Sequence, residues 1–133
     1  MENQIKLSVT DTKYFINPAK HSITCKMQYV VRYPLGVEPI IDYCSAMLGQ
    51  NNMDPSTNEV VVTARLHPND SWDEKVGMSV ARAKAESAAY KRVRKMLQRV
   101  MNHIYDTVVS PSYAFSNKAK EVEKHNVEYI SKF

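Results

Sequence analysis

The sequence predicts an α+β fold: a small antiparallel sheet followed by a long helix and a second C-terminal helix. Three patterns indicate this order. Apolar residues alternate along the first 32 residues, a compact apolar strand follows near residue 60, and apolar residues then recur at helical spacing. A chain of 133 residues can bury a modest core, so we expect residues 1–133 to form a single domain.

The first strands are predicted within residues 3–32. Apolar residues alternate with polar ones in a first run, which contains Ile5, Leu7, Val9, Tyr14 and Ile16. The sequence Asn-Pro-Ala-Lys at 17–20 is typical of a turn. A second period-two run follows, with Ile23, Cys25, Met27, Tyr29 and Val31 on one face. The two runs and the turn predict a β-hairpin.

Residues 34–58 are an insertion in the sheet. A short helix is expected there, because Pro39 suits a first helical position and Gly49 suits a helix end. The apolar residues between them follow helical spacing: Ile40, Ile41, Cys44, Met47 and Leu48. The apolar side of this helix either covers a sheet edge, which we favour, or contacts a neighbouring molecule.

The last strand is predicted at residues 59–66, before the turn His-Pro-Asn-Asp. Ser71 with Glu74 forms a capping-box pattern, so we expect a long helix over residues 72–106. Its apolar stripe consists of Ala85, Ala89, Val93, Met96, Val100 and Ile104. The pattern stops at Val108 to Pro111, and a final helix is expected over residues 116–131.

Composition excludes several classes of function. The chain has 18 Lys and Arg against 14 Asp and Glu, so a polyanionic partner would need a local basic patch. Cys25 and Cys44 lack CxxC spacing and are expected to be reduced, buried thiols. Because the first residues lack an apolar core and no long apolar run follows, we expect neither a signal peptide nor a membrane-spanning segment. Three glycines allow no P-loop or nucleotide-binding glycine motif.

The long helix carries a basic face. Between residues 82 and 99 the only acid is Glu86, and the basic residues are Arg82, Lys84, Lys91, Arg92, Arg94, Lys95 and Arg99. Of these, Lys84, Lys91, Arg92, Lys95 and Arg99 fall on one side of the helix. Like charges four residues apart repel, and a solvated helix usually intersperses acids. Two interpretations stay open: a soluble surface, or a site for phosphates, for which arginine forks are well suited.

Trp72, the only tryptophan, lies beside the predicted helix start. It either packs on the sheet or offers a stacking surface for a base. Asn69 can contact a base or ribose edge, and Arg82 can contact a phosphate. Asp70 and Asp73 count against phosphate and suit capping or ribose hydroxyls. The histidines, His21, His67, His103 and His125, lack metal-ligand spacing. With no nucleophile evident, we expect no enzyme, no catalytic residue, no metal and no cofactor.

Residues 64–85 contain the pattern A-x-x-H-P-x-D-x-W-D-x-x-x-G-x-x-x-A-x-A-K-A. It resembles a motif of small phage and bacterial proteins in which a short sheet leads through a similar turn into a helix. Those proteins usually have Phe at the position of Trp72, and the glycine corresponds to Gly77. The motif covers about a sixth of the chain. The insertion at 34–58 and the second helix lie outside it.

Within that group, the layout is similar to the first type of Thoeris anti-defence protein. The resemblance implies a phage-encoded sponge that binds cyclic ADP-ribose isomers or cyclic oligonucleotides without cleaving them. It also implies a homo-oligomer, for which related proteins suggest a hexamer, in the cytoplasm of a host bacterium. Trp72 would stack an adenine beside Arg82, whereas Arg99 and His103 would belong to a second, basic site.

Two other functions stay open. A sheet backed by a basic helix is similar to double-stranded nucleic-acid binding modules, although no basic loops flank the long helix. A protein inhibitor of a host nuclease, of the anti-CRISPR type, would instead use its basic or apolar surface to occupy its target. The cyclic-nucleotide sponge is the function that we favour.

Overall fold

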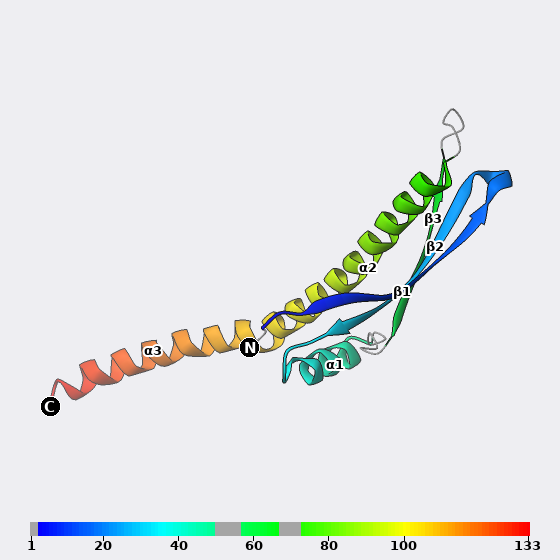
Figure 1. Ribbon diagram of the computed structural model, residues 1–133. Helices are drawn as coiled ribbons and strands as arrows, with labels where there is room; N and C mark the ends of the chain where they lie inside the picture. Colours follow the sequence, from blue (N-terminus) through cyan, green and yellow to red (C-terminus); the bar gives the residue numbers. More distant parts are fainter. Residues whose placement is uncertain (1–2, 50–56, 67–72) are drawn as a thin grey trace. The chain divides into compact units, whose positions relative to one another are not determined.

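The computed structural model describes residues 3–49, 57–66 and 73–133 (Figure 1). A three-stranded antiparallel sheet is followed by a long helical stretch, which confirms the predicted α+β class. The chain divides into two compact units, residues 1–97 and residues 98–133, and each is described by itself. Our expectation of one domain therefore stays a prediction.

The predicted hairpin is confirmed. Strand β1 (Lys6–Asn17) pairs antiparallel with strand β2 (Ser22–Arg32), and the single turn of 3-10 helix η1 (Pro18–Lys20) joins them. The Asn17 side chain accepts a hydrogen bond from the Lys20 backbone N–H at 3.3 Å. His21 then adopts the left-handed conformation, with φ of 44°, and this reverses the chain direction.

A β-bulge divides β1 into two parts. Val9 pairs with Tyr29, but Asp11 pairs with Gln28, so β1 contains one residue more than β2 at this point. The extra residue moves the half-buried positions from odd to even numbers, from Leu7 and Val9 to Tyr14. The bulge therefore explains why the apolar alternation in the sequence changes phase along this strand.

Strand β2 lies in the middle of the sheet, because β3 (Asn58–Arg65) pairs antiparallel with its other edge. The register places Met27 opposite Val60 and Ile23 opposite Ala64. One face of β2 is completely buried and consists of Ile23, Cys25, Met27, Tyr29 and Val31. These are the apolar residues of the second run in the sequence, so the predicted core face of this strand is confirmed.

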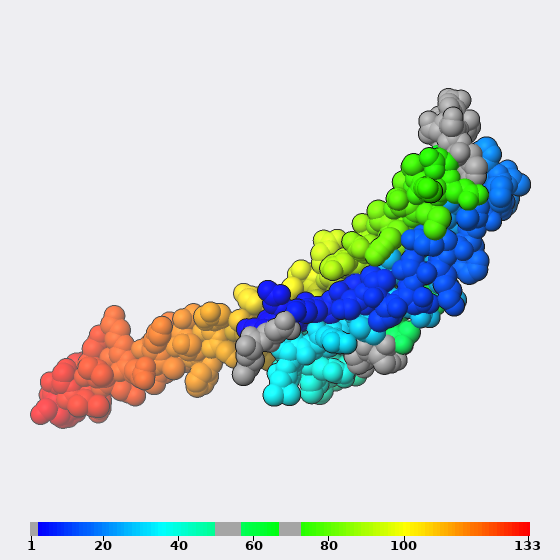
Figure 2. All heavy atoms as spheres, viewed as in Figure 1, coloured from blue at the N-terminus to red at the C-terminus, as the bar shows by residue number. Residues whose placement is uncertain are grey.

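Helix α2 (Glu74–Ile104) covers this buried face with its part in residues 74–97. Figure 1 shows that part running alongside the sheet, and in Figure 2 its atoms lie against those of β1. Ala81, Ala85 and Ala89 are fully buried in the same cluster as the β2 side chains. Small residues at a spacing of four let the helix backbone approach the sheet closely. Gly77 continues this approach, because a Cβ there would lie 2.6 Å from Ile23 Cδ1.

The insertion contains the predicted helix, α1 (Val37–Met47). It begins two residues before Pro39, which is therefore its third residue. This is tolerated because the first N–H groups of a helix have no partner within the helix. One face is buried, through Ile41, Cys44 and Ser45, and Cys44 is a free thiol like Cys25. Gly49 follows the helix in the left-handed region, with φ of 68°.

In residues 98–133 the expected gap between two helices, at 107–115, is wrong. The chain stays helical through the π-helical segment η2 (Tyr105–Val109) and α3 (Ser110–Ile130). The Ser110 N–H donates to the Tyr105 carbonyl, five residues back, so the turn before Pro111 is wider than an α-helical turn. This widening relieves the clash that a proline ring normally makes with the preceding turn.

Candidate functional site

The start of α2 is capped by Asp73. Its Oδ1 accepts hydrogen bonds from the backbone N–H groups of Lys75, at 3.0 Å, and Val76, at 3.3 Å, and its carbonyl accepts from Gly77 at 2.9 Å. The first residue of the helix is Glu74, so the expected start at Trp72 is wrong. A carboxylate is a strong acceptor and suits the positive end of the helix dipole, which favours Asp73 over Ser71.

This cap changes what the helix start can bind. A phosphate at a helix N-terminus needs free N–H groups, and Asp73 already accepts two of them. Its negative charge also repels a phosphate. A phosphate group near this end of the protein would therefore depend on side-chain cations such as Arg82 instead of the backbone.

Trp72 and Asn69, together with the expected cap Ser71, lie outside the described residues. Their proposed contact with a base stays a prediction. Arg82 lies within the described part of α2 and is exposed. It is close enough to Cys25 for its positive charge to act on the thiol. Burial raises the pKa of Cys25, and the Arg82 guanidinium opposes part of that rise.

Arg92 has a structural partner. Its Nη1 donates a hydrogen bond to the Glu59 carbonyl at 2.9 Å, which connects α2 to the start of β3. The same guanidinium lies near Tyr29, where it opposes the rise in pKa that burial gives to the phenol. The sequence does not indicate this contact, because Glu59 is 33 residues away. Arg92 is thus less available for a ligand than we expected.

Arg82 and Arg92 do not converge. With a rise of about 1.5 Å and a rotation of about 100° per residue, they lie about 15 Å apart along the axis and about 80° apart around it. Lys91 and Lys95, by contrast, are four residues apart and share one face. Both are exposed, and no acidic side chain within the described parts of the chain pairs with them.

In the second unit, Arg99 and His103 form a similar pair. They are also four residues apart on α2, Arg99 is exposed and His103 is half-buried. The His103 backbone carbonyl accepts a hydrogen bond from Thr107 Oγ1 at 2.7 Å. The imidazole ring takes no part in this bond. These two side chains are the members of the predicted second site that lie on a common face.

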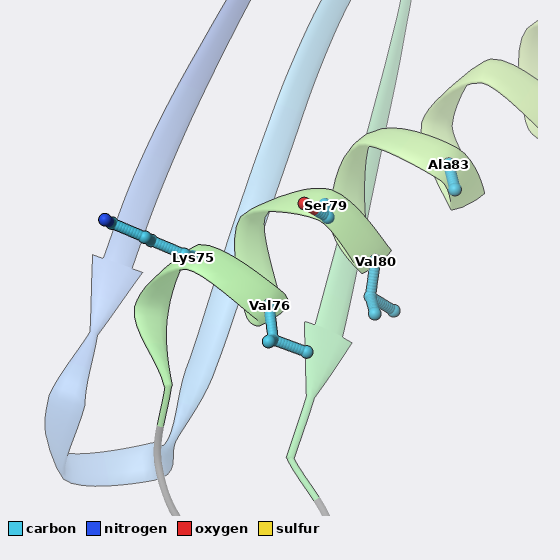
Figure 3. A pocket seen from close by; sticks show the side chains of 5 residues that line it. All are labelled: Lys75, Val76, Ser79, Val80 and Ala83. Carbon is cyan, nitrogen blue, oxygen red and sulfur yellow. The ribbon is translucent and has the colours of Figure 1, made fainter.

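The hollows on the first unit have a different character. One, of about 360 Å³, lies along α2 and is lined by Lys75, Val76, Ser79, Val80 and Ala83. Figure 3 shows Val76 and Val80 projecting to the same side of the helix, while Lys75 extends away. Another, of about 190 Å³, is lined by apolar residues and Arg94 between β1 and α2. Arg82 is part of neither lining.

Two findings concern metals and membranes. Among residues 3–49, 57–66 and 73–133, no three His, Cys, Asp or Glu side chains gather closely enough to hold a metal ion. In the same ranges, no helix has both the length and the apolar character needed to cross a bilayer.

Comparison with known proteins adds no neighbour: no family model, no curated protein and no solved structure matches the chain. The function is therefore inferred from the residues of the chain itself.

Proposed function

We propose that the chain binds a phosphate-bearing nucleotide without cleaving it, and that it is a phage-encoded anti-defence protein that sequesters cyclic ADP-ribose isomers or cyclic oligonucleotides. One observation carries the proposal. Cationic side chains line exposed faces of α2 at a spacing of four, and no acid within the described residues neutralises Lys91, Lys95 or Arg99.

The repulsion between neighbouring cations on α2 favours the binding of an anion. Lysines four residues apart on a helix destabilise it by about 0.2–0.5 kcal/mol per pair. A phosphate group between them turns that repulsion into attraction. In the second unit, the planar guanidinium of Arg99 can donate to two phosphate oxygens at once, and the His103 ring can add one further hydrogen bond.

The proposal extends to the region before α2 through the resemblance. There Trp72 would stack on an adenine, with Asn69 on its edge and Arg82 on a phosphate. The Asp73 cap supports Arg82, and not the helix N-terminus, as the contact for the phosphate. Homo-oligomerisation, the phage origin and a bacterial host cytoplasm stay predictions of the resemblance.

The test is binding by calorimetry to a panel of cyclic oligonucleotides and cyclic ADP-ribose isomers. One ligand should bind saturably, and heating the complex should release it with unchanged mass. Arg99→Ala should weaken binding of a ligand at the second site by at least about tenfold, since charge-assisted hydrogen bonds are lost. Arg94→Ala is the matched control: Arg94 lies about 140° away around the helix and should leave the affinity unchanged.

Trp72→Ala tests the first site in the same way. The proposal fails if no member of the panel binds to the folded protein, or if the ligand emerges cleaved. Binding that survives both Arg99→Ala and Trp72→Ala would show that the assigned residues are wrong. Affinity for duplex nucleic acid that falls steeply with salt would favour the nucleic-acid alternative. A stable complex with a host nuclease would favour the inhibitor.

A further inference from the structure

Helix α3 buries none of its residues. Its large apolar side chains are exposed, and the fractions reach 74% for Phe115, 57% for Tyr129 and 93% for Phe133 just beyond its end. Most helical stability in proteins comes from packing of an apolar face. An exposed apolar face that extends along a whole helix indicates a partner.

The spacing of that face is specific. Three large apolar residues, Phe115, Val122 and Tyr129, recur every seven residues, which is two turns at the 3.5-residue period of a coiled coil. The positions on this face, which we call the heptad face, are Ser112, Phe115, Ala119, Val122, Asn126, Tyr129 and Phe133. A period of 3.5 is the pattern of a helix that winds around another helix.

We propose that the heptad face binds a second copy of this chain, so that two α3 helices form a short parallel coiled coil. The charges beside the face favour this partner. Lys118 comes directly before Ala119 of the heptad face, and Glu123 comes directly after Val122 of that face. Glu123 thus lies five residues after Lys118. This is the spacing at which a residue on one helix meets its opposite charge on a parallel, in-register partner. The pair would form twice, once on each side.

Antiparallel pairing loses both contacts. In the antiparallel register that aligns every layer, Ala119 faces Val122, and Glu123 then meets Ser116 while Lys118 meets His125. If that register is shifted by one heptad, so that Val122 faces Asn126, the two Glu123 carboxylates come together. Like charges across a coiled coil are unfavourable, so orientation is decided by these two residues.

Asn126 favours the same arrangement. It lies on the heptad face among apolar and small residues, at a position that would become buried. In a parallel pair the two Asn126 side chains meet in one layer, where each amide can donate to the other. In the fully aligned antiparallel register Asn126 faces Phe115 and its amide has no partner, which costs free energy. A single buried Asn of this kind is known to select register and strand number.

Sedimentation equilibrium of the full chain tests the pairing. The parent protein should be a dimer, or a multiple of a dimer, that dissociates on dilution, because only three heptads are buried. Val122→Glu puts a charge in the buried seam and should weaken association by at least about tenfold. Lys124→Glu, on the outer side of the same turn, is the matched control and should not change the association constant.

Both substitutions introduce the same residue at an exposed helical position of the monomer, so circular dichroism should show that each variant remains folded. A monomeric parent protein at high micromolar concentration would overturn the proposal. So would Val122→Glu if it associated as tightly as Lys124→Glu. The pairing is independent of nucleotide binding, and neither result bears on the ligand site.

Disulfide trapping tests the orientation. In the parallel pair Val122→Cys lies opposite itself and should oxidise to a covalent dimer, whereas Lys124→Cys should not. Peptide mapping by mass spectrometry distinguishes this bond from any bond of the buried Cys25 or Cys44. Cross-linking only in a mixture of Ala119→Cys and Val122→Cys proteins would overturn the parallel arrangement.

Discussion

The two units of the chain use apolar helical residues in different ways. In residues 1–97, the apolar stripe of α2 begins with the small residues Ala81, Ala85 and Ala89, which are buried against β2. In α3, the apolar residues include aromatic rings and none of them is buried. The first stripe packs against a partner within its own unit, whereas the apolar residues of α3 have no such partner within residues 98–133.

The difference lies in the sizes and spacings of the side chains. Ala81, Ala85 and Ala89 recur every four residues, and small side chains let a helix lie close to the flat face of a sheet. The heptad face of α3 has larger residues at every seventh position, Phe115, Val122 and Tyr129, a spacing suited to another helix. Stability in the first unit should therefore be sensitive to added volume, and stability in the second to concentration.

The largest effect should come from filling the space between α2 and β2. Ala85→Leu adds three carbons at a fully buried position and should lower the free energy of unfolding by about 2–3 kcal/mol through overpacking. Ala83→Leu makes the same change on the exposed side of the helix and should cost little. Urea unfolding followed by circular dichroism measures both. Equal losses for the two variants would mean that α2 does not pack through its alanines.

A smaller effect should come from the helix ends. Asp73→Ala removes the side chain that caps two N–H groups of α2, and should cost about 1 kcal/mol of stability. Ser131→Ala removes a hydroxyl that donates to the Glu128 carbonyl at the exposed end of α3. That loss should stay below about 0.5 kcal/mol, as for most surface substitutions. A larger cost at Ser131 than at Asp73 would contradict the contrast between the units.

Most of the fold could be predicted because apolar periodicity is a local property. The buried face of β2, helix α1 and the long helix all follow from it, and the hairpin turn follows from the local sequence Asn-Pro-Ala-Lys. The bulge in β1 left a visible sign, the phase change between Val9 and Tyr14, but pairing with β2 was needed to interpret it. The continuity past Pro111 could not be predicted, because it depends on a single π-helical turn before the proline.

The candidate site was less predictable for a physical reason. The sequence identifies which residues are cationic, but not which of them already have partners. Arg92 contacts the Glu59 carbonyl only because α2 and β3 lie side by side in the folded unit. The sequence predicts a cap at Ser71, and Asp73 also suits capping; the hydrogen bonds of the folded backbone identify Asp73 as the cap.

The smallest expected effect is on how the free energy of unfolding changes with alkaline pH, which also differs between the two units. Tyr33, just after β2, has a hydroxyl with no hydrogen-bond partner among the described residues. Burial raises its pKa, and the nearby carboxylates of Asp42 and Glu38 raise it further. Unfolding returns the phenol to its ordinary pKa, so the unfolded chain loses its proton first as the pH rises.

The neutral Tyr33 hydroxyl thus contributes stability that is complete below the ordinary tyrosine pKa of about 10 and is lost as the pH rises through the raised folded value. Tyr33→Phe cannot ionise, so its free energy of unfolding should decline less steeply with alkaline pH than that of the parent protein. Tyr113→Phe, on the exposed surface of α3, is the matched control and should preserve the parent's decline. If Tyr113→Phe flattened the decline and Tyr33→Phe did not, the pH-sensitive burial would lie in the second unit, and the contrast between a closed first unit and an open α3 would be reversed.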